Sequence, residues 1–195
     1  MWVPLDASRN SLALPLLGLL VERPSHAYDL TTRLRERYGH LSVTRSTVTS
    51  LLKALERAGL VSSRLPERVG NRPPRTAYEL TEVGLADFCQ KVEVGLRDGQ
   101  VASVDFIMAV AYVGVLPADH AASILDARAD RLDHELTALQ EQPDGVLEVH
   151  MLEVDYWRTV VATEINWIGQ LAVRIRSHNI VWPGTQHNGL GRTEA

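Results

Sequence analysis

The sequence of 195 residues has little of what marks secreted or membrane-spanning proteins. It contains one cysteine, Cys89, so it cannot form an intrachain disulfide, and this suits a reducing compartment. No apolar run approaches the roughly 20 residues needed to cross a bilayer. The start MWVPLDASRN lacks the charged-then-apolar pattern of a signal peptide. We therefore expect a soluble protein of the cytoplasm.

The motifs of several enzyme classes are also absent. There is no G-x-G-x-x-G after a strand, no P-loop and no G-x-S-x-G. Cys89 lies in a helical pattern without a nearby histidine, so a neutral thiol is expected there. His134 with Asp130, and His150 with Glu153, have metal-binding spacing on a helix, but neither pair has a third ligand. We predict no enzyme, cofactor or metal, and keep a metal-dependent enzyme as an alternative.

The formal net charge of −4 is unevenly distributed along the chain. Residues 1–80 contain 12 Lys and Arg against 7 Asp and Glu, an excess of 5 positive charges. Residues 81–195 contain 8 basic and 17 acidic residues, an excess of 9 negative charges. A basic N-terminal part joined to an acidic remainder indicates a polyanion bound at one end, although a chance distribution on solvated surfaces gives the same numbers.

The first part of the chain has the element order of a winged helix-turn-helix domain. Three helical segments, SLALPLLGLLVERP, SHAYDLTTRLRERYG and TRSTVTSLLKALERAGLV, come first. We expect Ser11 and Ser25 to cap the first two, and Gly39 and Gly59 to end the second and third. Two strand-like runs, LVSSRL and TAYEL, then flank the turn-rich loop PERVGNRPPR and predict a two-stranded hairpin.

The remainder of the chain is helical almost throughout. Thr81 is the expected cap of one helix, and a second covers about 101–115. A third starts at Pro117 and carries a 4-3 seam formed by Leu125, Ala129, Leu132, Leu136 and Leu139. The last, about 146–177, carries a stripe of Trp157, Val161, Ile168, Leu171 and Ile175. The fold class is mainly α, and we expect domains at 1–85 and 86–182, with a flexible tail at 183–195.

The third helical segment opens with small hydroxyl residues that helices do not favour. Its apolar stripe of Val48, Leu51, Leu52 and Leu55 predicts a core face. On the opposite face, Ser and Thr let a helix approach the floor of the major groove and bond phosphates or bases. We interpret Thr44 as a cap. The candidate DNA-binding residues of this helix are Arg45, Ser46, Thr47, Thr49, Ser50 and Lys53, the alternative being an ordinary solvated face.

The loop between the two strand-like runs is the candidate wing. Its arginines Arg68, Arg72 and Arg75 could contact the adjacent minor groove or its phosphates and add salt-dependent affinity. Two prolines and a glycine are equally compatible with an ordinary surface loop.

These segments resemble the winged-helix domain of the PadR family of bacterial transcriptional regulators. The resemblance rests on LLGLLVERPSHAYDLTTRLRERYG, STVTSLLKALERAGLV and RPPRTAYELTEVG, over about residues 14–85. It implies a cytoplasmic homodimer that represses transcription and releases operator DNA when a small ligand, in many members an aromatic compound, binds. Ala27 and Thr49 stand where the family usually has glycine and tyrosine, so the contact at position 49 is expected to differ.

Large aromatic side chains could bind an effector of this kind. Trp157, Trp167 and Phe106 could stack on a flat ligand, with Glu164 or His150 as a polar anchor. Core or interface packing explains the same aromatic residues. Glu164 could instead pair with Arg158 or Arg174 of a second subunit.

A winged-helix domain can also act as a protein-protein adaptor without binding DNA. Such an adaptor more often exposes apolar or aromatic residues where this chain has hydroxyl groups, Arg45 and Lys53. The sequence therefore favours a DNA-binding regulator.

Overall fold

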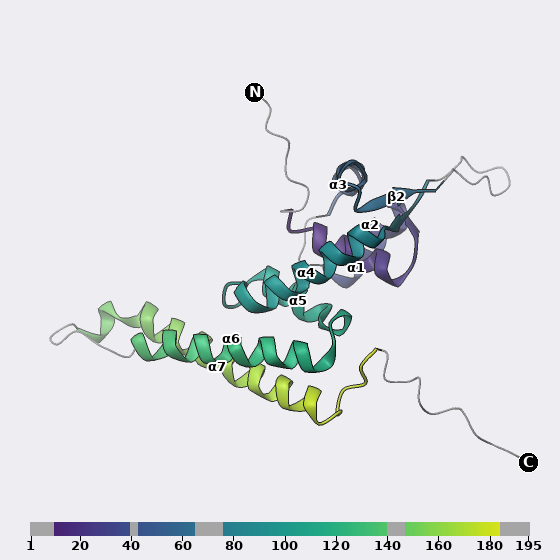
Figure 1. Ribbon diagram of the computed structural model, residues 1–195. Helices are drawn as coiled ribbons and strands as arrows, with labels where there is room; N and C mark the ends of the chain where they lie inside the picture. The colour runs from purple at the N-terminus through teal and green to yellow at the C-terminus, as the bar shows by residue number, and fades with distance from the viewer. Residues whose placement is uncertain (1–9, 40–42, 65–75, 140–146, 184–195) are drawn as a thin grey trace, which may run out of the picture. The chain divides into compact units, whose positions relative to one another are not determined.

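The computed structural model describes residues 10–39, 43–64, 76–139 and 147–183 (Figure 1). The chain divides into two compact units, Met1–Lys91 and Val92–Ala195. Helix α4 (Glu82–Asp98) begins in the first unit and ends in the second. The domain bounds expected from the sequence, 1–85, 86–182 and 183–195, stay a prediction.

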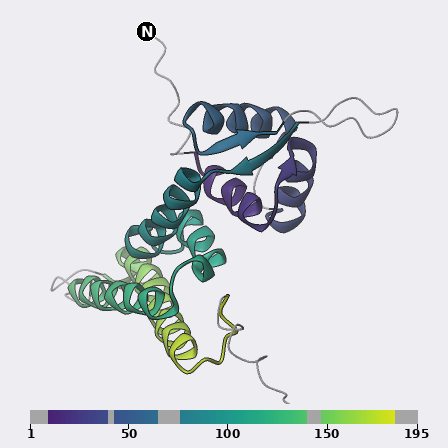
Figure 2. The same cartoon turned by 45° about the vertical axis from the view of Figure 1, so that its right-hand side comes forward.

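The first unit has the helix and strand order that the sequence predicts. Helices α1 (Ala13–Glu22), α2 (Ala27–Arg37) and α3 (Arg45–Arg57) precede strands β2 (Val61–Ser63) and β3 (Ala77–Leu80). The strands β2 and β3 pair antiparallel, with Val61 opposite Leu80. Figure 2 shows these strands together with the helices of the unit. The fold is a winged helix-turn-helix followed by helices, so the predicted fold class is confirmed.

A third strand, β1 (Ser25–His26), was not predicted. It pairs antiparallel with β3, Ser25 opposite Tyr78, and the sheet order is β1-β3-β2. Ser25 is therefore not the cap of α2, because pairing holds it in the sheet and its hydroxyl donates to the carbonyl oxygen of Arg23 at 3.1 Å. The N-cap of α2 is His26, whose side chain makes no capping bond.

The expected cap of α1 is also wrong. The helix begins at Ala13 with Leu12 as its N-cap, and Asn10 Oδ1, rather than Ser11, accepts a hydrogen bond from the Leu12 amide at 2.9 Å. Pro15 lies in the first turn, where a missing N–H removes no intrahelical bond.

The core of the first unit is formed by the predicted apolar faces. Leu30 and Leu34 of α2 are fully buried, as are Leu52 and Leu55 of α3, and α2 packs against both α1 and α3. Tyr78 of β3 is also buried, and desolvation, followed by the charge of Glu56, raises the pKa of its phenol. Burial of these side chains fixes which face of α3 points outward.

The second unit is built on two long helices. Helices α6 (Ala118–Ala138) and α7 (Leu152–Arg176) pack against each other, side by side and antiparallel (Figure 1). Leu125 and Leu132 of the predicted α6 seam are buried, and so are Val161 and Ile168 of the predicted α7 stripe. The short elements of this unit are α5 (Val104–Ala111) and the 3-10 turns η2 (Val113–Val115) and η3 (Glu148–His150).

Two helices start later than the sequence suggests. Helix α5 starts at Val104 instead of 101, because Ala102 has a positive φ of 55° and Ser103 Oγ accepts the first-turn amide of Phe106 at 3.2 Å. Helix α7 starts at Leu152, since the preceding η3 turn takes up Glu148–His150.

Within the described ranges, no helix has the length and apolar character required of a membrane span.

Candidate nucleic-acid interface

The start of α3 is fixed by the hydroxyl residues with which it opens. Thr44 Oγ1 accepts the amide of Thr47 at 3.1 Å, which confirms its role as N-cap. The same oxygen lies 2.7 Å from Thr47 Oγ1 and 2.9 Å from Ser46 Oγ. Three hydroxyl groups therefore form one hydrogen-bonded cluster at the positive end of the helix dipole.

The outer face of α3 is open over its first half. Arg45, Ser46, Ser50 and Lys53 are exposed, and Thr49 is half-buried. Thr49 Oγ1 already donates to the carbonyl oxygen of Arg45 at 2.9 Å. Among the described residues, the side chains of Ser50 and Lys53 have no hydrogen-bond or ion-pair partner, so their donors are available to an external ligand.

Sequence reasoning missed one aromatic residue beside this face. Tyr28 of α2 is 55% exposed, and the Arg45 guanidinium lies 5.8 Å from its ring centroid. This cation–π geometry holds the long Arg45 side chain near the helix start. Helical spacing could have identified Tyr28 as an exposed residue, because it falls outside the buried α2 stripe of Leu30, Thr31 and Leu34.

Both ends of α3 are attached to neighbouring elements. Before the helix, Arg35 Nε of α2 donates to the carbonyl oxygen of Val43 at 2.9 Å. After it, Gly59 has a φ of 74° and ends the helix as predicted. Thr81 Oγ1 donates to the Gly59 carbonyl at 2.7 Å and accepts the amide of Gly84 at 2.9 Å, so Thr81 caps α4 as expected.

The base of the wing is held by an ion pair across the two strands. Arg64 Nε donates to Glu79 Oε2 at 2.7 Å, and the Arg64 amide donates to the Ala77 carbonyl at 2.8 Å. The predicted wing arginines Arg68, Arg72 and Arg75 lie outside the described residues.

Three of the four candidate effector residues come together in the second unit. The rings of Phe106 and Trp167 meet edge to face, with centroids 6.4 Å apart and planes at 83°. Phe106 is 4% exposed and Trp167 is 42% exposed. Glu164 lies beside them and binds Arg128, whose guanidinium is 4.0 Å from the Phe106 ring centroid. No contact brings Trp157 into this group among the described residues.

Arg128 is the residue that the sequence analysis overlooked. Its side chain is fully buried, and it donates to Glu164 Oε1 and to the Gly99 carbonyl at 2.6 Å. In the sequence, Arg128 lies three residues after Leu125 and four before Leu132, within the buried stripe of α6. This position in an apolar stripe could have identified it as a buried charge. Glu164 thus binds Arg128 of the same chain, whereas the pairing with Arg158 or Arg174 of a second subunit, given above as an alternative, stays a prediction.

The two histidine pairs considered as metal ligands, His134 with Asp130 and His150 with Glu153, lie within the described residues. Within the described ranges, no group of three His, Cys, Asp or Glu side chains could hold a metal ion.

Residues 16–90 match the sequence model described as "Transcriptional regulator PadR-like family". The matched segment contains α2, α3, both wing strands and the start of α4. This segment of the chain is similar to the PadR-like family. The model describes transcriptional regulators, the class of protein that the sequence predicts.

Several solved structures of transcriptional regulators are similar to this one. Bacillus subtilis PadR in complex with operator DNA is 18% identical and covers 85% of this chain and 99% of its own, with a TM-score of 0.43. The same protein in complex with p-coumaric acid is 18% identical and covers 86% of this chain and 99% of its own, with a TM-score of 0.37. A transcriptional regulator from Clostridium thermocellum is 27% identical and covers 47% of this chain and 86% of its own, with a TM-score of 0.38. No curated protein matches the sequence.

Proposed function

We propose that this PadR-like regulator binds a specific duplex operator as a homodimer in the cytoplasm and represses transcription. The observation that supports it is the two-sided character of α3. Val48, Leu52 and Leu55 are buried, while Arg45, Ser50 and Lys53 are exposed. In a helix-turn-helix, the second helix of the motif lies in the major groove of DNA. Exposed side chains that are small or cationic, at the start of that helix, let it enter the groove and contact bases and phosphates.

The DNA contacts are assigned by the groups left available. Arg45 can reach a phosphate or a guanine edge, Lys53 a backbone phosphate, and Ser50 either. Ser46, Thr47 and Thr49 contribute mainly through small size, because their hydroxyl groups already bond within the helix. Arg68, Arg72 and Arg75 are proposed to contact the neighbouring backbone.

A small aromatic ligand is proposed to release the protein from DNA. The support is the cluster of Phe106, Trp167 and Glu164, in which a half-exposed indole borders a buried ring and a carboxylate. A flat ligand could stack on Trp167. Trp157, 41% exposed on the same helix, is a further proposed contact.

The test is a binding titration by fluorescence anisotropy on the DNA upstream of the protein's own gene. We expect affinity to fall steeply with added salt, because phosphate contacts release counterions. Arg45→Ala should weaken binding by roughly 5- to 150-fold for a base contact worth about 1–3 kcal/mol. Lys53→Ala should weaken binding to all sequences alike and reduce the slope of the salt dependence by about 1, because a phosphate contact is lost. Arg97→Ala, which removes an exposed arginine from the second unit, is the charge-matched control.

Binding unchanged in both α3 variants would contradict the contact assignment. For the ligand, a hydroxycinnamic acid such as p-coumaric acid is the first probe, followed by uncharged phenols, with Trp167 fluorescence and operator release as the two readouts. If the ligand quenches the fluorescence of a Trp167→Phe variant as strongly as that of the wild type, Trp167 is not part of the ligand site.

A further inference from the structure

The last turn of α4 is held by two arginine side chains of α6. The final carbonyl groups of an α-helix have no partner within the helix and lie at the negative end of its dipole. Here Arg128 Nη1 donates to the Gly99 carbonyl at 2.6 Å and reaches the Leu96 carbonyl at 3.4 Å. Arg131 Nη2 donates to the Arg97 carbonyl at 2.7 Å. The position of this turn therefore depends on two guanidinium groups.

The Arg128 guanidinium has a second set of contacts, in the group formed by Phe106, Glu164 and Trp167, which we call the aromatic cluster. It lies 4.0 Å from the centroid of the Phe106 ring. It also donates to Glu164 Oε1, from Nε at 3.0 Å and from Nη2 at 2.5 Å. The Phe106 ring in turn meets the Trp167 ring edge to face. One buried side chain thus contacts both the end of α4 and the aromatic cluster.

Helix α4 approaches α5 so closely that no side chain fits between them. A Cβ on Gly95 would lie 2.7 Å from the Cβ of Ala109, and a Cβ on Gly99 would lie 3.2 Å from the Cβ of Phe106. Close-packed contacts change between discrete arrangements and do not deform continuously. A shift of the last turn of α4 must therefore move Phe106 as well.

The turn between α4 and α5 is fixed by the same carboxylate. Ala102 has a φ of 55°, in the left-handed region that favours glycine. Its amide donates to Glu164 Oε2 at 2.8 Å. A backbone of this kind persists only where its surroundings hold it. The conformation of the turn is therefore linked to the ion pair between Glu164 and Arg128.

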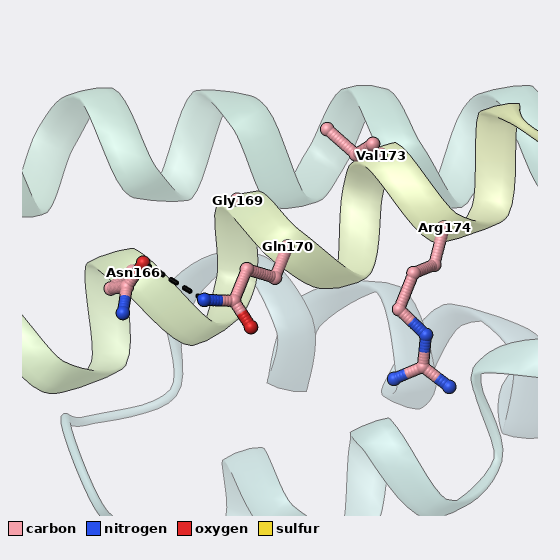
Figure 3. Close-up of a pocket in the computed structure, with 5 residues that line it drawn as sticks. All are labelled: Asn166, Gly169, Gln170, Val173 and Arg174. Carbon is pink, nitrogen blue, oxygen red and sulfur yellow. Dashed lines mark hydrogen bonds between the residues drawn. The ribbon is translucent and has the colours of Figure 1, made fainter.

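A hollow on α7 has no comparable connection. It is lined by Asn166, Gly169, Gln170, Val173 and Arg174, and Figure 3 shows its side chains. The hydrogen bond drawn there runs from Gln170 Nε2 to Asn166 Oδ1 at 3.1 Å, within one helix. A substitution of Gln170 therefore changes the surface of α7 without touching the contacts of Arg128.

We propose that Arg128 is the positioning residue that couples the aromatic cluster to α4. Because α4 begins in the first unit and ends in the second, a change in its last turn is carried along one continuous helix into the DNA-binding unit. Coupling between two sites is reciprocal, so a ligand on the cluster changes operator affinity only as far as the operator changes the cluster. The inference rests on the proposed operator binding and names the residue through which the ligand site acts.

The experiment is fluorine NMR of the full chain labelled with fluorotryptophan. The resonance of Trp167 is identified by its absence in a Trp167→Phe variant. We expect this resonance to shift when the operator duplex is added. In Arg128→Lys the shift should be lost, because lysine keeps a positive charge beside Glu164 but lacks the planar fork that bonds the carboxylate and the α4 carbonyls at once.

A second variant interrupts the same contacts at another residue. Phe106→Leu keeps an apolar side chain at this buried position and removes the ring between Arg128 and Trp167, so the shift should be lost here too. Arg131→Lys, at the end of α4 but outside the cluster, and Gln170→Ala, on α7, are the matched controls and should keep the shift. Circular dichroism shows which variants are folded, and Phe106→Leu decides if Arg128→Lys is not.

The outcomes separate the inference from the proposed function. Operator binding without a shift of the wild-type Trp167 resonance overturns the coupling alone, and so does a shift that persists in folded Arg128→Lys or in Phe106→Leu. Loss of the shift in Gln170→Ala as well would show a general effect on α7 and would also overturn the assignment to Arg128. A wild-type protein that binds no operator contradicts the proposed function, and the coupling falls with it.

Discussion

Arg128 of α6 donates two hydrogen bonds to a single oxygen of Glu164 of α7, from Nε at 3.0 Å and from Nη2 at 2.5 Å. The other carboxylate oxygen accepts the amide of Ala102 at 2.8 Å. The arginine is fully buried, and its Nη1 donates to the Gly99 carbonyl just after α4 ends. One ion pair thus joins α6 and α7 to the turn between α4 and α5.

Breaking this pair should strongly destabilise the second unit. Removing one member of a buried ion pair leaves an uncompensated charge and typically costs 3–5 kcal/mol, on the order of a third of the total stability of a small domain. We expect this loss for Arg128→Met and for Glu164→Leu in urea unfolding followed by circular dichroism. The double variant should recover part of it, because no charge is then left buried.

Arg131→Met is the matched control for this measurement, since Arg131 is 43% exposed and pairs with Glu135 on the same helix. Its exposed ion pair should contribute less than about 1 kcal/mol. Equal unfolding midpoints for Arg128→Met and Arg131→Met would show that the buried pair is not a stabilising element.

Two substitutions of Thr44 should distinguish its effect on helix stability from its effect on DNA binding. Thr44→Ala removes the capping oxygen and should cost about 1 kcal/mol. Thr44→Asp restores the cap, so its unfolding midpoint should return toward wild type. Its carboxylate would, however, repel phosphates at the start of α3, and affinity for the operator should fall further than in Thr44→Ala. Equal affinities of the two variants would place the start of α3 away from DNA.

Tyr28 should act through Arg45. An exposed cation–π contact is worth about 0.5–1 kcal/mol, so Tyr28→Leu should weaken operator binding by roughly 2- to 5-fold. In the Arg45→Ala background the same change should have little further effect, because the side chain that Tyr28 holds is gone. A double-mutant cycle by anisotropy measures this. Independent, additive losses would indicate that Tyr28 contacts DNA by itself.

The winged helix was predictable because its signals are local. Fewer than 20 consecutive residues contain all the signals of α3: its apolar stripe, its N-cap at Thr44 and the glycine that ends it, Gly59. Strand β1 was not predictable in this way. Two residues carry no periodicity, and Ser25 and His26 are extended only because β3, more than 50 residues later, pairs with them.

The same distinction holds for the candidate functional residues. The exposure of Arg45, Ser50 and Lys53 was predictable from helical spacing alone, since exposure on α3 follows from the position of its core stripe. Arg128 was missed because its role depends on Glu164, 36 residues away, and on carbonyl groups after α4. A charged residue inside an apolar stripe is the sequence signal for such a partner, and α6 and α7 each have one.

Cys89 should react slowly with thiol reagents. Burial raises the pKa of its thiol above the ordinary value, so less of the reactive thiolate is present at pH 8 than in a free cysteine. The folded state holds this proton more tightly than the unfolded chain does. The contribution of the protonated Cys89 thiol to folding stability is therefore complete below the ordinary pKa of a thiol, and it is lost as pH rises through the pKa of Cys89 in the folded state. Colourimetric thiol titration at several pH values, with and without urea, measures this; equal rates with and without urea would contradict it.

Two glycines inside helices should respond oppositely to alanine. A Cβ on Gly84 of α4 would lie 1.9 Å from the backbone carbonyl oxygen of Leu60, so either α4 or the chain before β2 must move. Overpacking of this kind costs about 1–3 kcal/mol. A Cβ on Gly169 of α7 meets nothing within 4 Å, and Gly169→Ala should raise stability by up to about 1 kcal/mol through helix propensity. Neither residue has a positive φ, so only steric contact separates the two positions. Thermal unfolding of the two variants measures the difference, and a loss of stability in Gly169→Ala as large as in Gly84→Ala would mean that the hollow on α7 has no room for a methyl group.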